Sequence, residues 1–169
     1  FRSPDDMLIK ITACNRGKEA AALHLLPTLW FRNTWSWPKG GSKPVLKSVK
    51  GSKCSVIHAQ HTDPLFLESL ADYYLYCEGK VPLLFTENET NTQRIFGVPN
   101  RSPYVKDSIN DYIVQGQKDA VNPGGVGTKA SSHYQLTVGP GATEVVRLRL
   151  TCTEPGKLRD PFGKFDAMV

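Results

Sequence analysis

The stretch "EVVRLRLT", Glu144–Thr151, alternates apolar and charged side chains along most of its length. Successive side chains of an extended chain point to opposite faces, so a period of two predicts a β-strand. Arg147 and Arg149 are expected on the outer face. The face expected to point into a core carries Val146, Leu148 and Leu150.

The residues before this strand predict a partner for it. "GPGA" at 139–142 has the glycine and proline content of a tight turn. We therefore expect a hairpin that joins His133–Val138 to Thr143–Cys152. Near the other end of the sequence, "MLIKITAC" (Met7–Cys14) shows the same alternation. Its apolar face consists of Met7, Ile9, Ile11 and Ala13.

The segment Ala20–Arg32 predicts one long strand that is largely apolar on both faces. Leu29 and Phe31 are expected in the core, and Trp30 on the opposite face beneath a covering element. Pro27 predicts a bulge or a free edge near the middle, because proline donates no ladder hydrogen bond. Further strands are expected at Val45–Lys50, Cys54–His61, Tyr73–Cys77 and Pro82–Thr86.

Many short strands separated by polar turns indicate an all-β fold, an antiparallel β-sandwich of the supersandwich kind with long loops. One helix is expected in "YVKDSINDYIVQG" (Tyr104–Gly116), where apolar residues recur at helical spacing. Lys118–Ser132 has the composition of a loop. We assign residues 1–159 to the sandwich, with upstream strands missing, and residues 160–169 to the start of a linker.

The 169 residues have 40% hydrophobic and 22% charged content and a formal net charge of +5. The basic residues are scattered, so we expect no nucleic-acid partner. No apolar run is long enough for a membrane span. The four cysteines form no closely spaced pair, so we expect no bound metal. Their wide spacing fits a reduced, cytoplasmic protein. We also expect no cofactor.

Two segments carry side chains that could contact a substrate or another domain. In "TENETN" (Thr86–Asn91), alternation places Glu87 and Glu89 on one face, roughly 7 Å apart at about 3.3 Å per residue. That spacing suits an acid–base pair, but a polar loop bonding its own backbone explains it equally well. In "TLWFRNTWSW", the rings of Trp35 and Trp37 suit core packing, an interdomain contact or a sugar platform.

Four longer segments resemble bacterial proteins of the glycoside hydrolase family 63 type, which are relatives of the processing alpha-glucosidases. They read "LHLLPTLWFRNTWSW", "YCEG", "LLFTENETNTQRIFGVPNRSPYVKDSINDYIV" and "AVNPGGVGTKASSHYQLTV". In that family an N-terminal β-sandwich precedes an (alpha/alpha)6 barrel that holds both catalytic acids. The resemblance here is to the sandwich alone, so no catalytic position is carried over to this chain.

The resemblance implies a non-catalytic sandwich that packs on the barrel of the same polypeptide and shapes its sugar pocket. A free-standing carbohydrate-binding module, with an oligosaccharide as partner, is the alternative. A sugar epimerase would need a histidine and a glutamate in one pocket. The residues expected to contact substrate or barrel are Arg32, Asn33, Trp35, Trp37, Glu87, Glu89, Asn91, Arg94 and Asp107.

Overall fold

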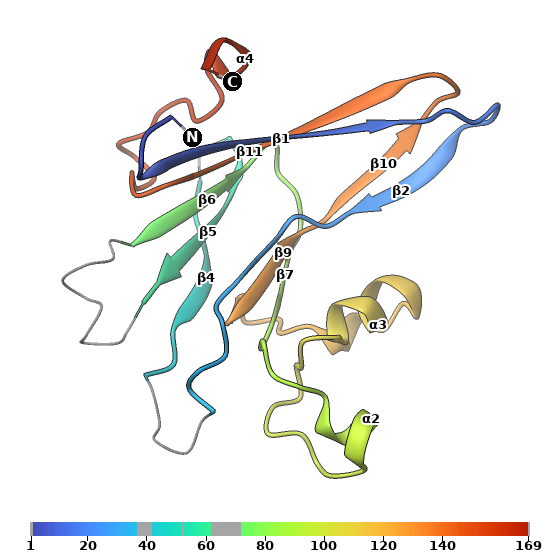
Figure 1. Ribbon diagram of the computed structural model, residues 1–169, viewed down its shortest axis with the longest axis vertical. Helices are drawn as coiled ribbons and strands as arrows, with labels where there is room; N and C mark the ends of the chain where they lie inside the picture. The colour runs from blue at the N-terminus through green and yellow to red at the C-terminus, as the bar shows by residue number, and fades with distance from the viewer. Residues whose placement is uncertain (1, 37–41, 52, 62–71, 169) are drawn as a thin grey trace.

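The computed structural model describes residues 2–36, 42–51, 53–61 and 72–168 (Figure 1). In chain order the strands are β1 Asp6–Cys14, β2 Ala21–Leu25, β3 Thr28–Trp30, β4 Val45–Val49, β5 Ser55–Gln60, β6 Tyr73–Cys77, β7 Leu83–Thr86, β8 Val126–Gly127, β9 Lys129–Ser132, β10 Tyr134–Val138 and β11 Thr143–Thr151. The helical elements are α2 Thr92–Phe96, α3 Ser108–Val114, the 3-10 turn η1 Lys118–Ala120 and α4 Phe165–Met168. Within these described ranges, no helix is long and apolar enough to cross a bilayer.

The strands form an all-β, sandwich-like fold with antiparallel pairing throughout. One sheet has the order β1-β11-β6-β5-β4-β8. The other strands form two further sheets, β3-β9-β7 and β2-β10. Only His133 separates β9 from β10, and only Leu26 and Pro27 separate β2 from β3, so these two sheets continue one another as a second layer.

The predicted strand Ala20–Arg32 is therefore interrupted at Pro27, between β2 and β3. Leu29 and Phe31 pack against the main core, which confirms their predicted side. The expectation for Trp30 was wrong: it is 55% exposed, because it lies on the outer face of edge strand β3.

The predicted hairpin between β10 and β11 is also wrong. β11 pairs with β1 and β6, whereas β10 pairs with β2, so the turn at 139–142 carries the chain from one layer to the other. The β1–β2 connection makes the same crossing beside it. Asn15 ties the two connections together through its backbone bonds to Ala142 and Gly141 and its side-chain bond to the Val138 carbonyl. Figure 1 shows both connections at the same end of the molecule.

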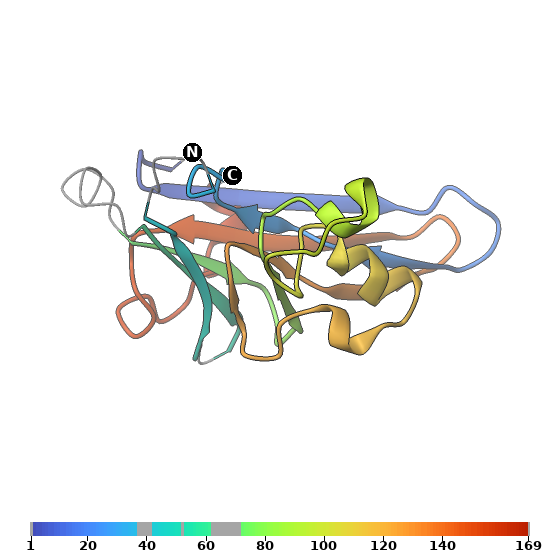
Figure 2. The same cartoon turned by 90° about the horizontal axis from the view of Figure 1, so that it is seen from below.

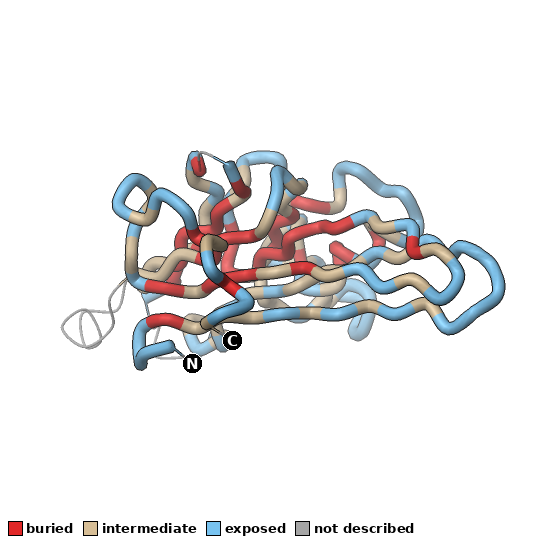
Figure 3. The backbone as a smooth tube through the Cα atoms, turned by 90° about the horizontal axis from the view of Figure 1, so that it is seen from above, coloured by how far each residue is buried: buried red, intermediate tan, exposed pale blue. Residues whose placement is uncertain are grey.

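The main core lies between the layers. It is built from both, including Leu46, Ile57, Leu75, Phe85, Ala130 and Leu148. β1 and β11, the two longest strands, pair with each other and run across the view in Figure 2. In Figure 3 the buried positions gather on one side of the view, and the connections between the layers, on the opposite side, are exposed.

The segment predicted as a loop at Lys118–Ser132 contains β8 and β9. β9 is the central strand of its sheet, and its residues Ala130, Ser131 and Ser132 are completely buried. The sequence did not predict this strand, because its small and partly polar side chains have the composition of a loop. Gly127 has a further reason to be small, because a Cβ there would lie 2.3 Å from the Thr86 carbonyl oxygen.

The arginine face of β11 is covered, which corrects the prediction that Arg149 points outward to solvent. Arg149 is 5% exposed and binds Asp6 through two hydrogen bonds of 2.8 and 2.6 Å. It also donates to the Pro161 carbonyl at 3.1 Å. Arg147 lies over the ring of Phe165 of α4, which is 2% exposed, and Asp166 pairs with Lys10 and Arg147. The described part of residues 160–169 thus packs on the sandwich; the onward linker stays a prediction.

Candidate functional site

The segment that follows β7 carries the two glutamates of the candidate site. Its backbone is fixed on one side by residues 104–106: Glu87 N donates to the Tyr104 carbonyl at 2.8 Å, and Lys106 N donates to the Glu89 carbonyl at 3.0 Å. Between the two glutamates, Asn88 donates from its side chain to the Phe31 carbonyl at 2.9 Å. These bonds fix the backbone on both sides of the bend at Asn88, and with it the positions of Glu87 and Glu89.

Both carboxylates face the same side, as alternation predicts, and they share one lysine. Lys43 Nζ lies 3.0 Å from Glu87 Oε1 and 3.6 Å from Glu89 Oε1. Thr128 donates to the other oxygen of Glu87 at 2.7 Å, and Trp35 Nε1 donates to Glu89 at 2.9 Å. The glutamate side chains are 17% and 15% exposed. Each is a partly buried carboxylate that already has a hydrogen-bond donor and a share of the Lys43 charge.

The loop after β3 is folded against this segment. Asn33 accepts hydrogen bonds from the Ser36 backbone and hydroxyl at 3.2 and 2.8 Å, and it donates to the Asn88 carbonyl at 3.2 Å. Trp35 is half-buried, so its ring is not a fully open platform. Arg32 lies exposed just beyond β3. Trp37 lies outside the described residues.

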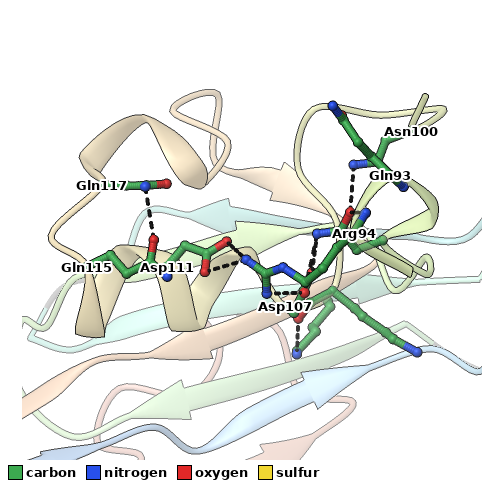
Figure 4. Close-up of polar contacts among 10 residues, drawn as sticks. Gln93, Arg94, Asn100, Asp107, Asp111, Gln115 and Gln117 are labelled. Carbon is green, nitrogen blue, oxygen red and sulfur yellow. Dashed lines mark hydrogen bonds and ion pairs between the residues drawn. The ribbon is translucent and has the colours of Figure 1, made fainter. Parts of the chain in front are cut away.

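The remaining three predicted residues meet in a second cluster, which joins α2 to α3 (Figure 4). Arg94 binds Asp107 at 2.6 Å and both oxygens of Asp111 at 2.9 and 3.0 Å. Asn91 caps α2 by accepting from Arg94 N at 3.0 Å, and it donates to Asp107. Hydrogen bonding to Asp111, then the charge of Asp107, raises the pKa of Arg94. Asn91, Arg94 and Asp107 therefore serve to position α2.

The contact residues expected from the sequence did not include three residues that complete these clusters: Lys43, Thr128 and Asp111. Asp111 carried a usable signal, since it lies four residues after Asp107 on a predicted helix, where both side chains share a face. Lys43 and Thr128 had none, because they come from segments far away in the sequence.

A shallow pocket of about 360 Å³ opens beside the first cluster. Its polar lining includes Asn33, Ser36, Glu89, Thr92 and Arg101. No group of three or more metal-ligating side chains occurs within the described ranges. The pocket can offer hydrogen bonds to a hydroxylated ligand.

An apolar tip, Ile95, Phe96 and Val98, lies on and just after α2. These side chains are 58%, 67% and 49% exposed, and α2 has no buried residue. A helix of five residues has little stability of its own. The tip keeps its shape because Asn91 caps the helix and Arg94 anchors it to α3.

Comparison with known proteins finds one curated relative at a significant level. It is an uncharacterized protein of Saccharomyces cerevisiae, 31% identical to this chain over 168 residues. The match covers 88% of this chain but only 15% of the yeast protein. The chain thus spans less than a sixth of the relative's length. No family profile and no solved structure matches this chain.

Proposed function

We propose that this chain is a non-catalytic β-sandwich module of a longer glycoside hydrolase of the family 63 type. It packs against an (alpha/alpha)6 barrel of the same polypeptide and shapes the rim of its sugar pocket. The observation that carries the proposal is the apolar tip, which is exposed yet rigidly held. The much greater length of the yeast relative supports a multidomain setting.

The site chemistry supports a positioning role over an acid–base role. A general acid or base must exchange a proton with its substrate. Glu87 and Glu89 are instead engaged by Lys43, Thr128 and Trp35. The cluster joins the loop after β3 to the segment after β7, and so gives that face of the sandwich a defined shape.

The apolar tip has the properties of a docking surface. Burying a side chain such as Phe96 contributes about 1.5–3 kcal/mol. A tip that is already held by Arg94 loses little conformational entropy on docking, so more of that free energy is available for association. Polar side chains nearby, such as Asn33 and Arg101, would form the rim around it.

The test uses the longer polypeptide that contains this chain, with Phe96→Asp compared to Val126→Asp. Val126 is 39% exposed and lies on β8, an edge strand of the six-stranded sheet. Phe96→Asp is expected to split a single calorimetric unfolding transition into two and to lower glucosidase turnover at least tenfold. The Val126 variant should change neither. The docking role would be refuted if both variants gave the same calorimetric profile and the same turnover while neither substitution changed the stability of the sandwich itself.

A free-standing carbohydrate-binding module is the second candidate, favoured by the exposed indole of Trp30 and the polar pocket near Glu89. Aromatic rings stack on the apolar faces of sugars, and this candidate predicts saturable quenching of tryptophan fluorescence by glucosides or mannosides. An unchanged spectrum at millimolar sugar eliminates it.

A further inference from the structure

A second cavity, with no part in the proposed docking, lies between α3 and the outer face of the second layer. Its volume is about 510 Å³, within the usual range for small-molecule sites. The wall formed by β2, β3 and β9 contributes His24, Thr28, Lys129 and Ser131. The wall formed by α3 and the residues before it contributes Lys106, Asn110 and several aliphatic side chains, including Ile109 and Ile113.

Lys129 has donor capacity to spare. Its ammonium makes one hydrogen bond, to the Lys106 carbonyl at 2.6 Å, although an ammonium carries three N–H donors. The side chain is half-buried, and burial lowers the pKa of Lys129; the charge of Asp107 opposes this shift, and the smaller effect of the Lys106 charge adds to it. An anion in the cavity would stabilise the charged form of Lys129 against its burial and against the repulsion from Lys106.

Two more donors on the helix side are unengaged. Across the described part of the chain, the side chains of Lys106 and Asn110 make no hydrogen bond or ion pair. Both are exposed where they border the cavity. Lys129 on the strand wall and Lys106 on the helix wall therefore give the cavity lining two lysine side chains, with the Asn110 amide on the helix wall.

The one acidic side chain of the lining, Asp107, offsets part of this charge, since it raises the pKa of Lys129. Arg94 pairs with it at 2.6 Å, and Asn91 donates to both of its oxygens at 3.2 and 3.3 Å. Arg94 brings a matching positive charge beside this carboxylate, so Asp107 does not cancel the charges of both lysines. The cavity is thus positive overall.

His24 supplies a further donor through its contact with His133. The Nδ1 of His24 lies 2.8 Å from Nε2 of His133, and the Nδ1 of His133 is buried with no hydrogen-bond partner. A buried N–H without an acceptor costs more than an unused lone pair, so His133 carries its proton on Nε2 and donates it to His24. Neutral His24 then carries its own proton on Nε2, which is left as a donor.

We propose that this cavity binds a small organic anion, with a phosphate or carboxylate group held by Lys106, Lys129 and His24. The hydroxyls of Thr28 and Ser131 line the strand side. Ile109 and Ile113 give the ligand body an apolar surface. The site recognises charge together with an apolar body, which distinguishes it from the polar pocket near Glu89.

The test follows backbone amide chemical shifts of the 169-residue chain during titration with phenyl phosphate, benzoate, inorganic phosphate and benzyl alcohol. The first two probes separate a phosphate from a carboxylate ligand. Inorganic phosphate tests the charge alone, and benzyl alcohol tests the apolar body alone. Saturable shifts at Thr28, Asn110 and Lys129 are expected with at least one of the two aromatic anions and not with benzyl alcohol.

The variants Lys129→Met and Lys106→Met are each expected to weaken that binding at least tenfold. Lys18→Met, an exposed lysine in the β1–β2 connection, removes the same charge and should leave affinity unchanged. Lys106→Met keeps the test valid if Lys129→Met unfolds. The proposal is overturned if Lys18→Met weakens binding equally, if benzyl alcohol binds as tightly, or if no probe gives saturable shifts.

Discussion

The ion pair between Asp6 and Arg149 gives the sharpest stability prediction. It joins β1 to β11, and the two residues are 8% and 5% exposed. Asp6→Ala leaves the buried guanidinium without its two bonds of 2.8 and 2.6 Å and with only the Pro161 carbonyl. Removing one partner of a buried pair costs about 3–5 kcal/mol. At about 2–4 °C per kcal/mol for a chain of this size, Tm falls by roughly 10 °C.

The assay is urea unfolding followed by circular dichroism at pH 7, with the double variant Asp6→Leu/Arg149→Met as the matched control. Replacing both charges by apolar groups removes the unpaired buried charge, so the control should lie within about 1–2 kcal/mol of the wild type. A loss below about 1 kcal/mol for Asp6→Ala would show that Arg149 is solvated in solution, contrary to its burial here.

Titration of the same pair supplies a second check. The hydrogen bond from Arg149, with its charge, lowers the pKa of Asp6 from its usual 3.8. The folded state therefore favours the ionised carboxylate. Its contribution to the free energy of unfolding is complete above pH 3.8 and is lost as pH falls through the lowered value. Asp6→Ala should show no such loss; an equal loss in both proteins would place its source elsewhere.

Two further predictions concern β9 and its neighbours. Burial, then the charges of His24 and Lys118, lowers the pKa of His133 from 6.5. Stability is therefore full above pH 6.5 and falls as pH drops from 6.5 toward the lowered value, and His133→Gln should flatten this part of the urea-midpoint profile. Gly127→Ala should cost more than about 2 kcal/mol in the same assay, because its Cβ would lie 2.3 Å from the Thr86 carbonyl oxygen. Gly79→Ala, which meets no atom within 4 Å but has a φ of +77°, should cost only about 1 kcal/mol.

The candidate site was only partly readable from sequence. Alternation placed Glu87 and Glu89 on one face, and helical spacing located α3. The partners that decide their chemistry come from elsewhere: Lys43 precedes β4, and Thr128 lies between β8 and β9. Such long-range contacts leave no local pattern. Two glutamates whose spacing suits an acid and a base are, in the fold, engaged by Lys43, Thr128 and Trp35.

Composition also misled where small polar residues are buried. Ser131 and Ser132 are completely buried in β9, yet their surroundings in the sequence have the composition of a loop. Arg149 alternates like a surface residue, but Asp6 and the segment around Pro161 cover it. In both cases the segments that pack on the strand decide whether its side chains are buried. The strand's own residues do not reveal which segments these are.

The amino-acid sequence by itself determined the fold class, most strand positions and the inward faces of β1 and β11, because alternation is a local property of an extended chain. Only the tertiary structure decided which strands pair. The turn at 139–142 reverses the chain, but the hydrogen bonds of β10 and β11 go to β2 and β1 in separate layers. A turn specifies a change of direction, whereas pairing depends on which distant strand buries the apolar face best.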